Sequence, residues 1–158
     1  MAYQKLQASR AIAVIPSDTV NIPNPAMLIV NSTTTGASAG KLIDSAGDFV
    51  NKGVKVGDIV YGGTTVAATV TAVDSATQLS VSTAVATATA YKIFSDETPN
   101  NGCVLYVGDI SGGANVALLT AGSDSVVLEN LLAGVFIPIQ TLRVDSTSTT
   151  AAKILALW

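Results

Sequence analysis

The sequence contains no histidine and a single cysteine, Cys103, among its 158 residues. Zinc sites take their three or four protein ligands mainly from these two residue types, so the usual zinc sites are excluded. One cysteine cannot form an intrachain disulfide, and it fits a chain that folds in a reducing cytoplasm. Because free cysteine is usually buried and Cys103 lies in the apolar run 103–107, we predict that it is a small core residue.

Charge is also scarce. Charged residues make up 12% of the chain and hydrophobic residues 49%, whereas charged residues are about 25% of typical soluble domains. The net charge is −3 and the mean hydropathy is +0.50. A monomer of this composition has little charge to keep it apart from other molecules. We therefore expect a homo-oligomer, or a chain whose surface is covered by other partners.

Long hydrophobic runs and basic clusters are missing as well. The longest apolar runs, such as 11–15, fall far short of the roughly 20 residues that cross a bilayer, so we expect no membrane insertion. The same run is too short for a secretory signal and is followed at once by Pro16. The eight Lys and Arg residues are scattered, and the net charge is acidic. Nucleic-acid binding therefore lacks its electrostatic signature.

What the sequence has in abundance is Val, Ile and Thr in short runs, separated by Gly, Asn, Asp and Ser. This pattern predicts an all-β chain. So many short strands must close or stack to hide their edges, which favours a β-sandwich or a barrel. The predicted strands are 11–15, 26–31, 40–44, 57–61, 66–73, 78–82, 90–94, 103–107, 115–120, 125–129, 135–144 and 152–157.

Turn-rich segments at 33–40 and 96–102 divide the chain. Between them, a Gly57–Asp58 turn and the alternating run 66–73 indicate a small barrel of about five strands. The strands 26–31 and 103–107 flank this block, and an insertion is tolerated best when its two ends lie close together. We predict a discontinuous, jelly-roll-like β-sandwich, 1–33 with 100–158, that carries an inserted small β-barrel, 34–99.

The last residues, 135–158, predict two strands joined by a Ser/Thr turn. The sequence closes on the apolar residues Ile154, Leu155, Leu157 and Trp158. A chain end usually frays in water. An end this apolar is best explained by a final strand that is buried in a sheet or docked on a neighbour.

One segment matches a catalytic pattern. Gly36-Ala-Ser38-Ala-Gly40 fits the G-x-S-x-G sequence of serine hydrolases, whose serine needs a base, normally histidine, and a strand-to-helix turn. The chain has no histidine, no helix is predicted after Ser38, and its neighbours are small. A lysine base is conceivable, but a flexible linker is the favoured interpretation.

The acidic residues were considered as calcium ligands or as a glycosidase pair. Asp44, Asp48 and Asp58 are close in sequence but lack the calcium-loop spacing, so solvated turn carboxylates are predicted. A carboxylate pair that hydrolyses sugars usually works beside stacking aromatics, which are only 5% of this chain. Tyr61, Tyr91, Phe94 and Tyr106 lie in strand patterns and are assigned to the core. Turn positions are also predicted for Asp96, Glu97, Asp109 and Asp124.

The glycine-rich segment 108–113 was considered as a phosphate-binding loop. It lacks the lysine and the following helix of such a loop, so a hairpin loop is predicted. The sequence thus implies no catalytic, cofactor-binding or metal-binding residue and no cofactor.

Three blocks of the chain resemble a known family. The strand Phe136-Ile-Pro-Ile139, then Arg143-Val144, the turn 147–151 and the closing 154–158 resemble the C-terminal signature of the head-spike base family, small virion proteins of tailed phages and gene transfer agents. The blocks 13–18 and 105–109 resemble two further parts of that family, in the same order. The predicted barrel resembles modules that recur as insertions in phage structural proteins.

The resemblance implies a non-enzymatic virion structural protein: a capsid-associated decoration (cement) protein, or a head-spike or fibre base. Such a protein would be assembled in the host cytoplasm and would dock on the major capsid protein or other virion proteins. A trimer is the common state of decoration proteins, and a pentamer at a capsid vertex is the alternative. Two other functions stay open, a tail or baseplate component and a carbohydrate-binding adhesion module; a hydrolase ranks third.

Overall fold

The computed structural model describes residues 8–96, 100–109 and 113–158. This part of the chain is nearly all β and contains two antiparallel sheets, consistent with an all-β sandwich. Each of its strands overlaps one of the ranges predicted from the sequence. A short 3-10 helix, η1 (Pro25–Met27), adds the helical part.

The chain divides into two compact units. The outer unit contains Met1–Pro25 and Asn100–Trp158, and the inserted unit contains Ala26–Pro99. The strands of the outer unit are β1 (Ala11–Ala13), β8 (Cys103–Asp109), β9 (Ala114–Thr120), β10 (Ser125–Leu131), β11 (Val135–Val144) and β12 (Ala152–Leu157). Those of the inserted unit are β2 (Leu28–Thr33), β3 (Lys41–Ile43), β4 (Ile59–Gly62), β5 (Val66–Ser75), β6 (Gln78–Val81) and β7 (Ala90–Phe94).

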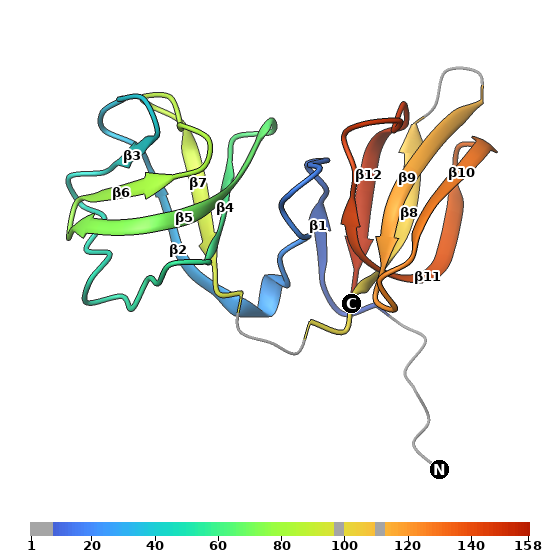
Figure 1. Cartoon of the computed structure of the whole chain (residues 1–158), viewed down its shortest axis with the longest axis horizontal. Helices are drawn as coiled ribbons and strands as arrows, with labels where there is room; N and C mark the ends of the chain where they lie inside the picture. The colour runs from blue at the N-terminus through green and yellow to red at the C-terminus, as the bar shows by residue number, and fades with distance from the viewer. Residues whose placement is uncertain (1–7, 97–99, 110–112) are drawn as a thin grey trace, which may run out of the picture. The chain divides into compact units, whose positions relative to one another are not determined.

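The sheet of the outer unit has the order β1-β12-β8-β11-β9-β10 (Figure 1). Its long strand β11 lies between two partners: Val135–Ile137 and Thr141 pair with β8, and Thr141–Val144 pairs with β9. Each of these ladders contains a register shift. Such irregularities bend a strand. Alternate residues of β8, β9, β11 and β12 then enclose one apolar core, whose members include Leu105, Leu118, Ile137 and Ile154.

An N-terminal arm closes this core. The amides of Val14, Ser17 and Ile22 donate to the carbonyls of Ile154, Val144 and Leu142 at 2.8, 2.9 and 2.8 Å. Ile22 is buried inside the same core cluster. The C-terminal strand β12 lies between β1 and β8, and Trp158 packs against the core. The prediction that the last strand is buried in a sheet is confirmed.

The inserted unit has the sheet order β2-β7-β4-β5-β6-β3. Strand β5 is shared in the same way, since its first half pairs with β4 and its second half with β6. The predicted closed barrel is not shown by these ladders. Among the described residues, no ladder pairs the edge strands β2 and β3. An isolated bridge joins Gly36, in the connection after β2, to Ile43 of β3.

Strand β2 corrects the predicted domain boundary. We expected 26–31 to lie beside 103–107 in the parent sandwich, but β2 pairs with β7, and β8 pairs with β11 and β12. The boundaries of the inserted unit are therefore 26 and 99 instead of 34 and 99. The reason is cross-strand packing: Val30 belongs to the core cluster of the inserted unit, together with Tyr91 and Ile93 of β7.

The predicted hairpin loop at 108–113 is also wrong. Gly108 lies inside β8, and β8 and β9 are not neighbours, because β11 separates them in the sheet. Residues 110–112 of that segment lie outside the described residues.

Candidate functional site

The hydrolase-like segment 36–40 forms the connection between β2 and β3. Ser38 is exposed, and its carbonyl accepts a hydrogen bond from the amide of Lys41 at 3.1 Å. A strand follows this segment where a nucleophile elbow would need a helix. The segment therefore serves as a turn.

The acidic residues Asp44, Asp48 and Asp58 differ in exposure. Asp48 is exposed, but Asp44 and Asp58 are 1% and 4% exposed, so the prediction of solvated carboxylates is wrong for these two. Both stay close to turn amides: Asp44 accepts from Ala46 at 2.9 Å and Asp58 from Lys55 at 2.8 Å. Among the described residues, no group of three or more potential ligands could hold a metal ion.

Asp44 is the centre of a buried polar network. Its Oδ2 atom accepts hydrogen bonds from the hydroxyls of Ser32 and Tyr91, both at 2.7 Å. Ser32 and Tyr91 are cross-strand partners on β2 and β7, and Asp44 follows β3. The carboxylate thus joins the loop after β3 to the opposite edge of the sheet.

The surroundings of Asp44 shift two pKa values. Burial opposes its ionisation, but the hydrogen bonds from Ser32, Tyr91 and Ala46, with the charge of Lys52, outweigh burial and lower the pKa of Asp44. Burial, reinforced by the hydrogen bond and charge of Asp44, raises the pKa of Tyr91. The carboxylate therefore stays ionised and the phenol stays protonated, which suits a structural contact.

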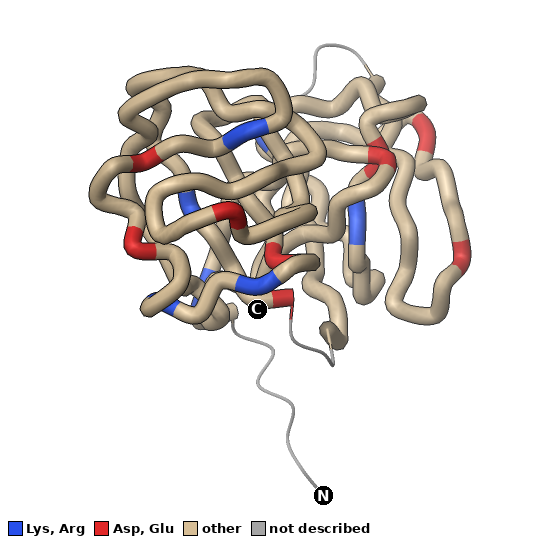
Figure 2. Tube along the Cα trace, turned by 60° about the vertical axis from the view of Figure 1, so that its left-hand side comes forward, with Lys and Arg blue, Asp and Glu red and all other residues tan. Residues whose placement is uncertain are grey.

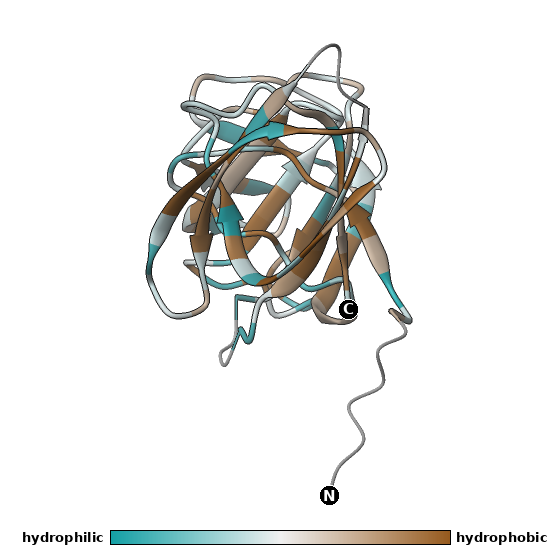
Figure 3. Ribbon diagram, turned by 90° about the vertical axis from the view of Figure 1, so that its right-hand side faces the viewer, coloured by the Kyte–Doolittle hydropathy of each residue, from teal (hydrophilic) through white to brown (hydrophobic). Residues whose placement is uncertain are grey.

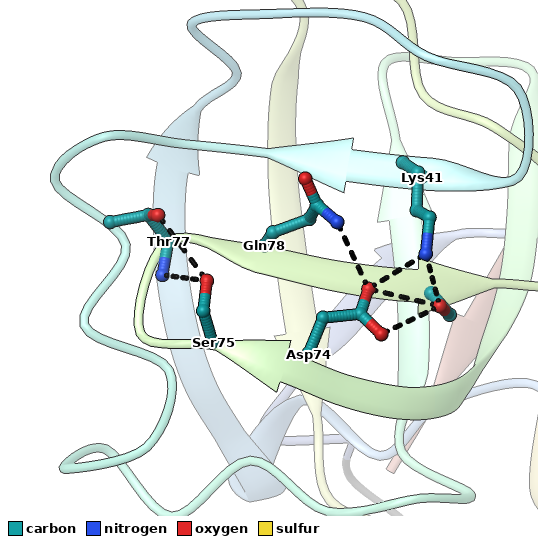
Figure 4. Close-up of polar contacts among 6 residues, drawn as sticks. Lys41, Asp74, Ser75, Thr77 and Gln78 are labelled. Carbon is teal, nitrogen blue, oxygen red and sulfur yellow. Dashed lines mark hydrogen bonds and ion pairs between the residues drawn. The ribbon is translucent and has the colours of Figure 1, made fainter.

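A second polar cluster connects three neighbouring strands at the surface (Figure 4). The ammonium of Lys41 on β3 lies 2.9 Å from Asp74 Oδ2 on β5 and 2.7 Å from Ser80 Oγ on β6. Ser80 Oγ and Gln78 Nε2 also donate to Asp74, at 3.0 and 3.3 Å. The hydrogen bond from Lys41 is the largest cause that lowers the pKa of Asp74.

This cluster has the atoms of a Ser–Lys pair but not its chemistry. In a Ser–Lys hydrolase, a neutral lysine accepts the proton of the serine hydroxyl. Here the ammonium of Lys41 donates to Ser80 and forms an ion pair with Asp74, and an ammonium has no lone pair with which to accept the hydroxyl proton. The cluster acts as a clamp across β3, β6 and β5.

Asp96 is influenced by a second carboxylate, Asp58. Although Asp96 is exposed at the surface, partial desolvation and then the charge of Asp58 raise its pKa. The amide of Lys55 donates to Oδ2 of Asp58, so that carboxylate holds a turn.

Cys103 is 3% exposed, and it belongs to the core cluster of the outer unit, so the prediction of a core residue is confirmed. Burial raises the pKa of its thiol to about 12. The thiol lies 3.4 Å from the carbonyl of Thr141. A thiol that remains protonated is a poor nucleophile.

The outer unit also has exposed apolar side chains at one edge of its sheet and in the turn before β11. Val126, Val127, Leu132 and Phe136 are 37%, 47%, 70% and 62% exposed. All four lie within β10, β11 and the turn that joins them. Figure 3 faces this side of the unit and shows hydrophobic stretches along its strands.

Phe136 begins a row of apolar side chains across the sheet. It pairs with Tyr106 on β8, which pairs with Leu155 on β12. The Phe136 and Tyr106 rings are 5.0 Å apart and tilted by 52°. The neighbouring residues Leu105 and Ile137 point into the core, so the row lies on the opposite face. Tyr106 is only half-buried, unlike Tyr61, Tyr91 and Phe94, which are in the core as predicted.

Comparison of the chain with protein-family models, curated proteins and solved structures found no match. Within the described residues, no helix has the length and apolar character needed to cross a membrane. The geometry thus offers two polar clusters that act as clamps, and exposed apolar side chains on β10, on β11 and in the turn that joins them. These exposed side chains are the candidate functional site.

Proposed function

We propose that the chain is a non-enzymatic virion structural protein: a capsid-associated decoration (cement) protein, or the base of a head spike or fibre. It docks on the capsid and on copies of itself. The observation that carries this proposal is the exposure of large apolar side chains on the outer unit, with Leu132 and Phe136 exposed by 70% and 62%. Burial of apolar area is the main favourable term in protein association.

Two further features support an assembly role. In each of the two polar clusters, around Asp44 and around Lys41, the polar side chains form hydrogen bonds or ion pairs with one another. Neither cluster shows an activated nucleophile. The charged residues are spread along the trace in small numbers (Figure 2), so long-range charge contributes little to partner choice. A protein of this kind recognises its partner through shape and apolar contact.

Binding to particles tests the proposal. Purified protein is added to virions that lack it, and co-sedimentation is measured for the wild type, Phe136→Asp and the control Val56→Asp. Val56 is 66% exposed in the inserted unit, so its substitution matches the change in surface charge. We expect only Phe136→Asp to lose binding. A wild-type protein that neither sediments with particles nor occurs in purified virions refutes the role.

Location on the particle separates the two virion alternatives. Density for the protein on the head in a cryo-EM map supports a decoration or spike-base protein. Density on the tail or baseplate instead identifies a tail component and refutes docking on the capsid. The symmetry of that density also decides between the expected trimer and the pentamer.

The exposed ring of Phe136 beside Tyr106 supports a second candidate function, carbohydrate binding. Sugar platforms favour exposed aromatic side chains, and the scarcity of aromatics in the sequence argued against such a site. A glycan array probed with the wild type and with Phe136→Ala distinguishes the two functions. Binding that is lost in the variant supports an adhesion module, whereas no glycan binding supports the structural role.

A further inference from the structure

Strand β10 is an edge strand, and among the described residues β9 is the one strand that pairs with it. It stands at the end of the outer unit's sheet, and its ladder is with β9 (Figure 1). Its residues are exposed or half-buried along all seven positions. An edge strand of this length presents a row of backbone donors and acceptors to another chain.

The register of β10 shows which backbone groups face outward. Ser125 pairs with Leu119, and the amide of Thr120 donates to the carbonyl of Asp124 at 2.9 Å. In an antiparallel ladder, this bond means that Ser125 and Leu119, although directly opposite, form no backbone hydrogen bonds with each other. By the same alternation, the N–H and C=O of Ser125 and Val127 point away from β9.

Natural edge strands are guarded by being short, by carrying lysine or proline, or by β-bulges. The edge strands β1 and β3 are each three residues long, and the edge strand β2 has six residues. Strand β10 has seven residues, contains no Lys, Arg or Pro, and exposes Val126 and Val127 by 37% and 47%. Its ladder with β9 is regular from Ser125 to Leu128, and the register shifts between Leu128 and Leu131. Its one charged residue is Glu129.

We propose that β10 is a contact strand between two copies of this chain, paired antiparallel with β10 of the second copy across a two-fold axis at Val127. The two Val127 residues then exchange N–H···O bonds through their outward backbone groups. Two strands that add in this way extend the sheet from one copy into the next.

The sequence of β10 is complementary to itself in this register. Val126 faces Leu128 of the other copy, on the side of the sheet where Leu128 packs against the core. The regular part of β10 ends at Leu128, because the register shifts between Leu128 and Leu131 and Asn130 has a φ of 55°. The pairing therefore joins residues 126–128 of the two copies, where apolar side chains meet apolar ones, and Glu129 lies outside it.

This inference rests on the proposed assembly role, because it identifies the partner as a second copy. A two-fold contact joins chains in pairs. A trimer with three-fold symmetry contains no two-fold contact. The β10 contact would therefore be an additional contact, beside those of the trimer expected from the sequence. The resulting particle contains two chains. If the chains also form a ring through a second contact, it contains a larger even number of chains.

Substitution of Val127 by proline is a selective test. Proline removes the outward N–H of residue 127, whereas the hydrogen bonds to β9 come from its neighbours, and edge strands tolerate proline. Val127→Thr keeps the N–H and the branched shape and is the matched control. Circular dichroism and the melting temperature confirm that both variants fold.

Light scattering after size exclusion, at about 100 µM protein, gives the mass. We expect an even number of chains for the wild type and for Val127→Thr, and half that mass for Val127→Pro. A wild-type mass of one or three chains overturns the proposal. A mass that Val127→Pro leaves unchanged also overturns it.

Cross-linking tests the register and does not depend on the proline variant. In the double variant Val126→Cys with Leu128→Cys, each new thiol lies opposite its partner's in a pair without backbone hydrogen bonds, where the side chains are closer. We expect a reducible dimer on mild oxidation and little dimer from Val126→Cys alone. Equal yields from the two variants contradict the register.

The results also separate this inference from the proposed function. Protein that binds particles but shows no β10 contact overturns the pairing and leaves the virion role intact. Protein that pairs through β10 but never binds particles overturns the virion role and leaves the pairing intact.

Discussion

The phenol of Tyr91 donates a 2.7 Å hydrogen bond to the carboxylate of Asp44, 47 positions earlier in the chain. Tyr91 is 1% exposed, and its ring packs against Phe49 at 6.4 Å. One side chain thus belongs both to the apolar core of the inserted unit and to its buried polar network. The loop after β3 is held at two points, by Phe49 and by Asp44.

Removal of the phenol should destabilise the protein while keeping the ring packing. A hydrogen bond to a charged group contributes about 1.5–3 kcal/mol, so we expect Tyr91→Phe to lower the free energy of unfolding by about that amount. Ser32→Ala, which removes the other donor to Asp44 Oδ2, should cost a comparable amount. Because both act on one oxygen, the double variant should deviate from additivity. Urea denaturation measures all three, and a neutral Tyr91→Phe contradicts the network.

Acid should weaken the same contact. The pKa of Asp44 is lowered in the folded chain, so its contribution to stability is present above its unfolded pKa of about 3.9. That contribution is lost as the pH falls through the folded pKa. The difference in unfolding free energy between the wild type and Asp44→Asn should therefore be largest near pH 7 and shrink below about pH 4. If the unfolding free energies of the wild type and of Asp44→Asn change with pH in the same way over this range, Asp44 is not the group that titrates.

Gly102 should tolerate alanine less well than Gly53. Both have positive φ, +76° and +75°, which alanine adopts at a cost of about 1–2 kcal/mol. A Cβ on Gly102 would also meet the backbone N and O of Thr141 at 3.0 Å, whereas the space at Gly53 is open. Overpacking of this kind adds about 1–3 kcal/mol. Equal melting temperatures for the two variants contradict this account.

Deletion of the inserted unit should succeed only at the boundaries that the sheets define. Replacement of residues 26–99 by a Gly/Ser link removes a complete sheet, and the outer unit should remain folded. Replacement of 34–99 alone leaves β2 without its partner β7, which should cause aggregation through the free strand. Truncation after residue 149 removes β12 and should unfold the outer unit. Circular dichroism and size exclusion compare the three proteins, and a folded 34–99 deletion contradicts these boundaries.

The strands were predictable because they depend on local pattern. In β8, the buried residues Cys103, Leu105 and Val107 alternate with the half-buried residues Val104 and Tyr106, and Asn101 and Gly102 precede the strand. Strand partners were less predictable. Strands β2 and β8 have similar apolar sequences, so pattern alone could not assign one to each sheet.

The polar clusters were not predictable for the same reason. Lys41 and Asp74 are 33 positions apart, and nothing near either residue in sequence indicates its partner. Asp44 was assigned to a solvated turn because its neighbours are Ser45 and Gly47. A tyrosine on β7 could have suggested a buried hydrogen-bond partner, since a buried phenol usually finds one.

The N-terminal arm that closes the outer unit determines the order in which the two units can fold. Its first strand, β1, pairs with β12, and the bonds of Val14, Ser17 and Ile22 all go to residues between 142 and 154. Residues 11–22 must therefore wait until residues 142–157 have left the ribosome. The inserted unit has every strand of its sheet once residue 94 has emerged. Since domains fold as units during synthesis, the middle of the chain folds first, and the two ends combine last.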